Sequence, residues 1–160
     1  MLDGPSIAGA LKTSGITHVV WIPDSELGAW EPALASAEGL SLVRVCREGE
    51  AFAVAAGLYL GGKRPIIMIQ CTGLFEAGDA LRNVLHDMKL PLFLVVGVRS
   101  YYLHRQDATT DTCPVFTEPI LRAWEIPYEV LDERSSAADL AAAIAAARAE
   151  NRAGAVLIAE

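Results

Sequence analysis

The sequence predicts an α/β fold, a three-layer structure in which a six-stranded, mainly parallel sheet carries helices on both faces. Short apolar, β-rich runs alternate with longer Ala/Leu-rich segments of helical periodicity. Several apolar runs contain almost no polar residue, as strands buried on both faces require. The 160 residues suit a single domain, residues 1–160, and no repeat, linker or low-complexity tract divides them.

The elements follow in the order helix then strand, six times. Asp3 can cap the first helix, Pro5 suits its first turn, and Gly15 is placed to end it. Strands are expected at Thr17–Ile22, Leu42–Val45, Ile66–Gln70, Leu92–Gly97, Tyr128–Leu131 and Ala155–Ile158. The later helices are expected at Leu27–Ala37, Glu48–Leu60, Glu76–Met88, Glu118–Trp124 and Ala137–Glu150. These helices are long enough to make right-handed crossovers between parallel strands.

One segment, Val98–Phe116, shows neither the periodicity of a helix nor that of a strand. It is also longer than the usual connection between two elements. Its polar and aromatic side chains are Tyr101, Tyr102, His104, Arg105, Gln106 and Asp107. We expect an irregular loop with a functional role.

Composition and charge exclude several classes of protein. With 52% hydrophobic and 21% charged residues, the chain has the composition of a folded protein. Its net charge of -7 argues against a broad surface for nucleic acid or anionic membrane, since both are polyanions. An anionic ligand would therefore need a local basic patch.

The spacing of the cysteine and histidine residues matches neither a metal-binding motif nor a disulfide framework. The odd number of cysteines and their spacing predict reduced thiols, and the scattered histidines predict no metal held by this chain alone. These residues are Cys46, Cys71, Cys113, His18, His86 and His104. The start of the chain lacks a signal-peptide pattern, and no apolar run approaches the roughly 20 residues of a membrane span. We therefore expect a cytoplasmic protein.

Ligands of open parallel sheets bind beyond the carboxyl ends of the strands. Four segments follow predicted strands: Ile22–Glu26, Arg47–Ala51, Gln70–Leu74 and Val98–Phe116. Neither the G-x-G-x-x-G fingerprint nor the P-loop is present. A site at this edge must work without a standard phosphate-binding loop.

The stretch from Val45 to Leu74 places Glu48 where a strand meets an apolar, glycine-punctuated helix. It resembles the pyrimidine-binding domain of thiamine-diphosphate enzymes, in which a glutamate opens such a helix before an A-x-A-A-G-like run and a G-K pair. Here these are Ala53–Gly57, Gly62 and Lys63. The segments IPDSEL (Ile22–Leu27), IQCTGL (Ile69–Leu74) and, more weakly, IPYEVL (Ile126–Leu131) narrow the resemblance to phosphonopyruvate and sulfopyruvate decarboxylases.

The resemblance implies that Glu48 is catalytic. A carboxylate beside the pyrimidine nitrogen favours protonation there, which lets the neighbouring amino group act as a base toward the thiazolium carbon. Glu50 would point about 200° away around the helix, so we expect it to be solvated or at a subunit contact. The alternative for Glu48 is that it complements the positive end of its helix.

The resemblance also implies a cofactor pocket built by the turns around Glu48. Its further cofactor-binding residues would be Pro23, Asp24, Gln70, Thr72, Gly73 and Leu74, and Ser25 would contact substrate. The alternative is that these residues form ordinary turns into helices. The chain departs from the family pattern at Phe75, Glu76 and Asp79, which leaves an altered pocket or reaction open.

Arg99, His104 and Arg105 are candidates to hold an anionic substrate, against the alternative of solvated loop charges. The family also implies a second domain that binds the diphosphate through a metal, with a G-D-G motif. This sequence lacks that motif, since Ala77–Leu81 (AGDAL) falls in a predicted helix without the second glycine. The resemblance therefore implies a diphosphate-binding β subunit, Mg²⁺ bound mainly by that subunit, and a hetero-oligomer.

The predicted function is that of one subunit of a thiamine-diphosphate decarboxylase. The substrate would be an anionic 2-oxo acid such as 3-sulfopyruvate or 3-phosphonopyruvate. One alternative is a carboligase or another 2-oxo acid enzyme subunit. The other is a non-catalytic doubly wound binding or structural module, because a fold does not determine a function.

Overall fold

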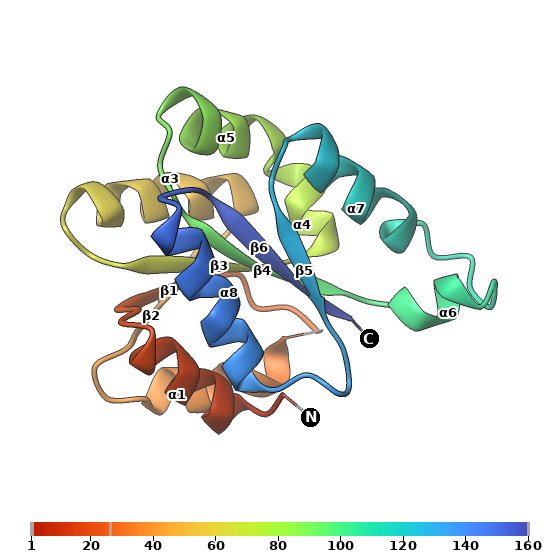
Figure 1. Cartoon of the computed structure of the whole chain (residues 1–160), viewed down its shortest axis with the longest axis horizontal. Coiled ribbons are helices and arrows are strands. Elements are labelled where there is room, and N and C mark those ends of the chain that lie inside the picture. Colours follow the sequence, from red (N-terminus) through yellow and green to blue (C-terminus); the bar gives the residue numbers. More distant parts are fainter. Residues whose placement is uncertain (1, 26, 160) are drawn as a thin grey trace.

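The computed structural model describes residues 2–25 and 27–159, so Met1, Glu26 and Glu160 lie outside the described residues. The predicted α/β fold is confirmed. Six strands form one sheet in the order β2-β1-β3-β4-β6-β5, and every neighbouring pair is parallel (Figure 1). The strands are β1 (His18–Trp21), β2 (Ser41–Arg44), β3 (Pro65–Gln70), β4 (Phe93–Val98), β5 (Tyr128–Leu131) and β6 (Gly154–Ala159).

Helices cover both faces of this sheet. One face carries α1 (Gly4–Thr13), α2 (Glu31–Ser36) and α8 (Ala137–Ala149). The other carries α3 (Glu48–Leu60), α4 (Cys71–Glu76), α5 (Gly78–Arg82) and α7 (Cys113–Ala123). A short helix, α6 (Tyr101–Arg105), lies beyond the end of β4 at one edge of the molecule (Figure 1).

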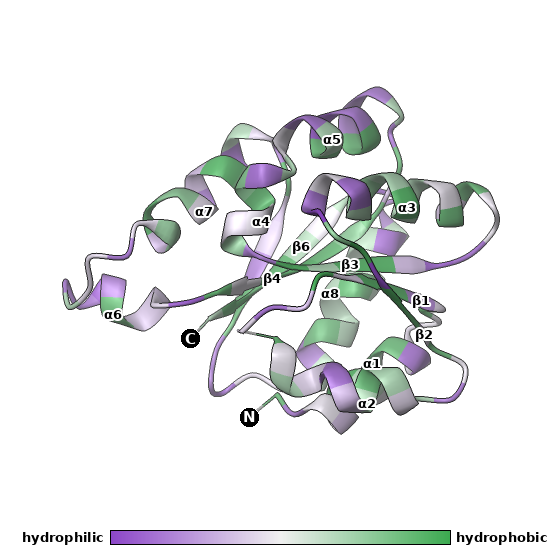
Figure 2. Cartoon of the chain, turned by 180° about the vertical axis from the view of Figure 1, so that it is seen from behind, coloured by the Kyte–Doolittle hydropathy of each residue, from purple (hydrophilic) through white to green (hydrophobic). Residues whose placement is uncertain are grey.

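Alternate residues of the central strands supply two cores. On one face Val20 and Ile67 pack in a cluster with Phe52 of α3, and on the other Val19 and Ile66 pack in a cluster with Ile7 of α1. Figure 2 shows hydrophobic residues along the central strands, whereas the helices carry both hydrophobic and hydrophilic residues. The near absence of polar residues in the central strands is thus explained by burial on both faces.

The first helix forms as the sequence predicts. The Asp3 side chain accepts the backbone N–H of Ser6 at 2.8 Å, which satisfies one of the donors left free at a helix start. Ser14 caps the other end, and Gly15 follows with a φ of +71°, a conformation that glycine adopts at little cost.

The expectation of an irregular loop over Val98–Phe116 was wrong. This segment contains α6 and the start of α7, which begins at Cys113 and not at Glu118. Pro114 suits the first turn of α7, and the Asp111 side chain accepts the N–H of Cys113 at 2.9 Å. The helix therefore starts at a local capping arrangement at Cys113, ahead of the predicted start at Glu118.

Two other helices also differ from expectation. The helix predicted at Glu76–Met88 begins at Cys71, directly after β3, and continues as α4, α5 and a π-helical turn, η2 (Asn83–Asp87). The helix predicted at Leu27–Ala37 begins as a 3₁₀ turn, η1 (Gly28–Trp30), and ends at Ser36. Pro32 lies in the first turn of α2, where its missing N–H leaves no helical bond unmade.

Candidate functional site

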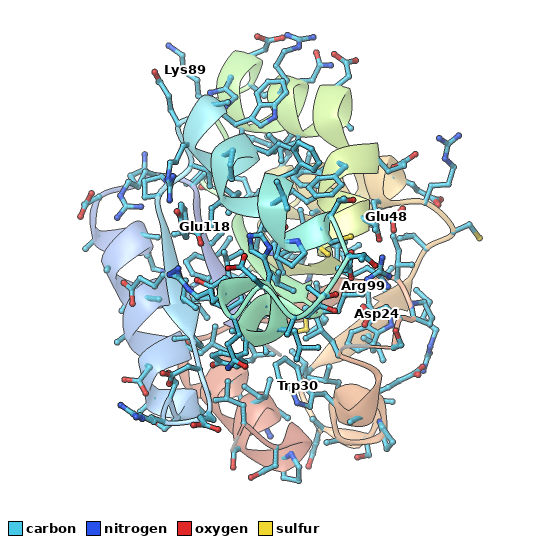
Figure 3. The ribbon with its side chains drawn as sticks, turned by 90° about the vertical axis from the view of Figure 1, so that its right-hand side faces the viewer. Asp24, Trp30, Glu48, Lys89, Arg99 and Glu118 are labelled. Carbon is cyan, nitrogen blue, oxygen red and sulfur yellow. The ribbon has the colours of Figure 1, made fainter. Side chains whose placement is uncertain are left out.

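The carboxyl ends of four parallel strands bring the predicted site residues to one edge of the sheet. Asp24 follows β1, Glu48 follows β2, Gln70 ends β3 and Arg99 follows β4. In Figure 3, which faces this edge, Asp24, Glu48 and Arg99 lie on the same side of the view. The edge is therefore where a ligand of this sheet would bind.

Glu48 and Gly73 are in direct contact across this edge. Glu48 is the first residue of α3, and Gly73 lies in α4. A Cβ atom built on Gly73 would lie 2.4 Å from Cγ and 2.7 Å from Oε1 of Glu48, closer than atoms can approach. Glycine at position 73 therefore leaves the space that the half-buried Glu48 side chain fills.

The Glu48 carboxylate has no hydrogen bond or ion pair with another residue in the described ranges 2–25 and 27–159. Arg47 before it is extended, with φ -145° and ψ 148°, and provides no side-chain cap to α3. A partly buried carboxylate that no protein group satisfies is available to a ligand.

Glu50 points elsewhere, as its position on the helix predicts. Its Oε2 accepts the backbone N–H of Cys46 at 2.9 Å, and the residue is exposed. A carboxylate in the third position of a helix commonly reaches back to the preceding turn in this way. Glu50 thus supports the turn into α3, while Glu48 faces the strand edge.

Glu76 supplies the cap that α3 lacks. Its Oε2 accepts the N–H of Gly49 at 2.9 Å, and its Oε1 accepts hydrogen bonds from Arg47 Nε at 3.0 Å and Nη2 at 2.5 Å. The backbone hydrogen bond from Gly49 and the Arg47 guanidinium lower the pKa of Glu76. Glu76 therefore ties the end of α4 to the first turn that carries Glu48.

The end of β3 contributes polar groups and a buried anchor. Thr72 Oγ1 donates to Gln70 Oε1 at 2.7 Å, and both side chains are half-buried. Leu74 is fully buried in the core on the α3 face, so its side chain holds α4 to the sheet. Gln70, Thr72 and Gly73 are the members of this segment that lie toward the edge.

The segment after β1 forms a capped turn. Asp24 is half-buried, and its Oδ1 accepts the N–H of Leu27 at 2.7 Å. Pro23 and Ser25 are exposed. This geometry fits the turn that the Pro-Asp sequence suggests and keeps Asp24 at the same edge as Glu48.

The predicted substrate residues separate into two places. Arg99 Nε donates to Asp111 Oδ2 at 2.8 Å, and Arg99 Nη2 donates to Cys113 Sγ at 3.3 Å. The backbone N–H of Cys113 and the Arg99 guanidinium lower the pKa of Asp111 to about 2, and Asp111 in turn raises the pKa of Arg99. Arg99 therefore joins the end of β4 to the start of α7, with 45% of its side chain still exposed.

His104 and Arg105 line a different hollow, of about 460 Å³, between α6 and α7. Glu118 lies in the same hollow and accepts hydrogen bonds from Tyr101 Oη at 3.2 Å and Tyr128 Oη at 2.6 Å. The Tyr128 hydroxyl lowers the pKa of Glu118. In Figure 3, Glu118 lies on the opposite side of the view from Glu48.

Sequence reasoning missed the roles of Arg47, Glu76 and Asp111. Each acts through a partner distant in the chain or placed on an irregular segment, so no spacing could have indicated it. Among the described side chains, no group of three or more His, Cys, Asp or Glu residues is arranged as metal ligands. None of the described helices combines the length and the apolar character needed to cross a membrane.

The sequence matches a known family over residues 4–117, the family described as thiamine pyrophosphate enzyme, N-terminal TPP binding domain. Sulfopyruvate decarboxylase subunit alpha of Methanococcus maripaludis is 26% identical over 119 residues, which cover 74% of this chain and 71% of that protein. Its counterpart from Methanothermobacter thermautotrophicus is 28% identical over 123 residues, 77% of this chain and 74% of that protein.

Longer proteins match as well. Phosphonopyruvate decarboxylase of Streptomyces viridochromogenes is 30% identical over 95 residues, which cover 59% of this chain and 24% of that protein. A crystal structure described as that of a thiamin diphosphate-dependent enzyme from Mycobacterium smegmatis superposes with a TM-score of 0.68 and 22% identity. The superposition covers 98% of this chain and 30% of that chain, and it supports the same fold.

Proposed function

Because this chain belongs to the family of thiamine pyrophosphate enzymes through their N-terminal TPP binding domain, we propose that it is the pyrimidine-binding subunit of a thiamine-diphosphate decarboxylase. The substrate is an anionic 2-oxo acid such as 3-sulfopyruvate or 3-phosphonopyruvate. The names of the relatives support this substrate class, since they include sulfopyruvate decarboxylase subunits alpha and phosphonopyruvate decarboxylase.

The observation that carries the proposal is the Glu48 carboxylate, half-buried at the carboxyl edge and without a partner among the described residues. A pyrimidine ring nitrogen is a group that such a carboxylate can satisfy. Gly73 has no side chain, so the Glu48 side chain fills the space beside it and its carboxylate lies at the edge that a flat ring would approach. The residues present therefore fit the cofactor that the family implies.

Glu48 holds a proton at the pyrimidine nitrogen in this proposal. The Glu76–Gly49 hydrogen bond fixes the turn from which Glu48 projects, and Gly73 lets the carboxylate lie at the edge. Pro23, Asp24, Gln70, Thr72 and Leu74 shape the surrounding pocket. When bound, thiamine diphosphate would supply a thiazolium ring whose deprotonated carbon is nucleophilic toward a 2-oxo acid and which can hold the electron pair left behind when carbon dioxide departs.

Substrate recognition is assigned to the cationic side chains of the same edge. Arg99 keeps exposed N–H groups beside its contact with Asp111, and guanidinium groups bind sulfonate or phosphonate oxygens through two bonds at once. Ser25, His104 and Arg105 are the further candidates. His104 and Arg105 line the hollow between α6 and α7, whereas Arg99 bonds to Asp111, so the two sets of cations are separate candidates for the substrate contact.

A diphosphate-binding β subunit and Mg²⁺ complete the active site in this proposal. The 160 residues contain no G-D-G motif, and relatives matched over most of their length are named as alpha subunits. The working unit is a hetero-oligomer in which the partner holds the metal and the diphosphate.

Calorimetry of thiamine diphosphate binding tests this division of the site. The purified chain alone should bind the cofactor weakly and turn over no substrate, and addition of the partner with Mg²⁺ should produce tight binding and activity. Tight, metal-dependent binding to the chain in isolation would contradict the shared site.

A further inference from the structure

A second hollow, of about 200 Å³, opens at the amino edge of the sheet. Its wall comes from the residues that precede β1, β3 and β4 and from the last turns of α3 and α8. Glu48 and the other candidate cofactor residues lie at the carboxyl edge, so this hollow is at the other end of the sheet. It is therefore separate from the proposed pyrimidine pocket.

Two arginines converge on one turn at the rim of this hollow. Arg148 Nη1 donates to the backbone carbonyl of Ser14 at 2.7 Å. A Cβ atom on the neighbouring Gly15 would lie 2.7 Å from Nη1 of Arg64, so glycine there makes room for the second guanidinium. Carbonyl groups at the end of α1 attract both cations, and two like charges on the same turn repel each other.

The charges around the hollow do not balance. Arg152 is the third arginine of the lining, and its Nε donates to Glu150 Oε2 at 2.6 Å. Arg64 and Arg148 form no ion pair with any carboxylate in residues 2–25 and 27–159, and no Asp or Glu of these ranges lines the hollow. Two positive charges thus remain uncompensated in a chain of net charge -7.

The floor of the hollow is apolar. Ile16, Leu92, Phe93 and Ile144 are all buried, with exposed fractions between 1% and 7%, and Tyr59 stands beside them with 36% exposed. A ligand that matches this lining has two negative charges at one end and a small apolar body at the other. A phosphate monoester carries close to two negative charges at neutral pH.

We propose that this amino-edge hollow binds a small organic phosphate, with the phosphate between Arg64 and Arg148 and the apolar body on the floor formed by Phe93 and its neighbours. Two of the three guanidinium groups, those of Arg148 and Arg152, are already held by backbone carbonyls, which reduces the ordering that binding requires. The proposal does not depend on the cofactor chemistry at the other edge.

Phenyl phosphate is the probe for this site, titrated into the full chain by calorimetry and by NMR. We expect saturable binding with shifts in the amide signals of Gly15, Arg64 and Arg148, and an affinity that falls as salt is added. Phenol should not bind, because it lacks the phosphate group. Inorganic phosphate should bind about tenfold or more weakly than phenyl phosphate, because it lacks the apolar ring.

Arg64→Gln and Arg148→Gln should each weaken phenyl phosphate binding about tenfold or more, the scale of one lost charge-assisted hydrogen bond. Arg134→Gln is the matched control, because it removes the same charge from an exposed position after β5. All three side chains are exposed, so thermal unfolding without ligand should remain near that of the wild type. Unchanged affinity in the first two variants, equal binding of inorganic phosphate, or shifts confined to Glu48 and Gly73 would overturn the proposal.

Discussion

The Glu76 carboxylate accepts the backbone N–H of Gly49 and so caps α3 from another helix. The capped turn is the one that carries Glu48, and the same carboxylate holds the guanidinium of Arg47. A helix start without a local cap leaves backbone donors unsatisfied, so this long-range contact replaces the usual capping side chain.

Glu76→Ala should lower the free energy of unfolding by about 1 kcal/mol at neutral pH, the usual cost of a lost cap. The pKa of Glu76 is lowered in the folded state, so its contribution is present above the ordinary value of 4.5 and is lost as the pH falls below it. Urea unfolding at several pH values measures the difference. Glu38→Ala, at an exposed position, is the control. A difference in unfolding free energy between wild type and Glu76→Ala that persisted at acid pH would contradict the capping role of the Glu76 carboxylate.

Glu48→Gln should leave the fold intact and lower turnover by about two to four orders of magnitude, the range for loss of a positioned proton-transfer group. The measurement is kcat of the complex reconstituted with partner and saturated with cofactor. Glu50→Gln removes a carboxylate two positions away that bonds to Cys46, and it should retain most of the activity. Near-normal turnover in the Glu48 variant would refute its catalytic role.

Gly73→Ala should reduce activity by about 10²-fold, because the new methyl group would displace the Glu48 side chain and misplacement of a catalytic group costs on this order. Gly57→Ala in α3 is the matched control, since the Cβ it would add meets no atom within 4 Å outside the neighbouring backbone of its own helix. Thermal unfolding of both variants separates a local displacement from a general loss of stability. Equal activities for the two would show that the Glu48–Gly73 contact is not needed.

Asp111→Asn should destabilise the chain by about 1 kcal/mol or more, because it weakens a charge-assisted bond to Arg99 and the cap of α7. The folded-state pKa of Asp111 is about 2, below the ordinary 3.8. The stabilisation is therefore complete above pH 3.8 and disappears as the pH falls toward 2. Urea unfolding of wild type and Asp111→Asn across this pH range measures that loss of stabilisation. Glu133→Gln, at an exposed position, is the control.

Arg99→Ala and Arg105→Ala distinguish the two candidate substrate contacts. The variant that removes the real contact should lose about 1.5–3 kcal/mol of transition-state binding with sulfopyruvate or phosphonopyruvate, and little with pyruvate. The readout is the ratio of kcat/KM values for the anionic substrate and pyruvate, which is insensitive to the fraction of folded enzyme. Equal losses on both substrates would assign the arginine to the fold or an interface.

The strands and α3 could be predicted because their signals are local. An apolar run such as Ile66–Ile69 is buried on both faces, and Gly61 and Gly62 stop the helix that Glu48 begins. The position of Glu48 at the strand edge followed from the parallel topology, and the structure has that topology. The catalytic role of Glu48 remains a prediction.

The remaining features depend on contacts that no local pattern encodes. Glu76 and Gly49 lie 27 residues apart, and their bond arises from the packing of α4 against the start of α3. The early start of α7 depends on Asp111 and Pro114, and a second proline, Pro119, lies inside that helix, where proline more often marks a helix boundary.

The two outer strands, β2 and β5, determine how this molecule can associate. Each is four residues long, Arg44 of β2 pairs with Glu31 at 2.7 Å, and Glu129 is exposed in the middle of β5. Short, charged outer strands discourage the addition of a further strand from another chain. Neighbouring molecules should therefore dock through helices or strand ends, and the sheet should not grow into fibrils under native conditions.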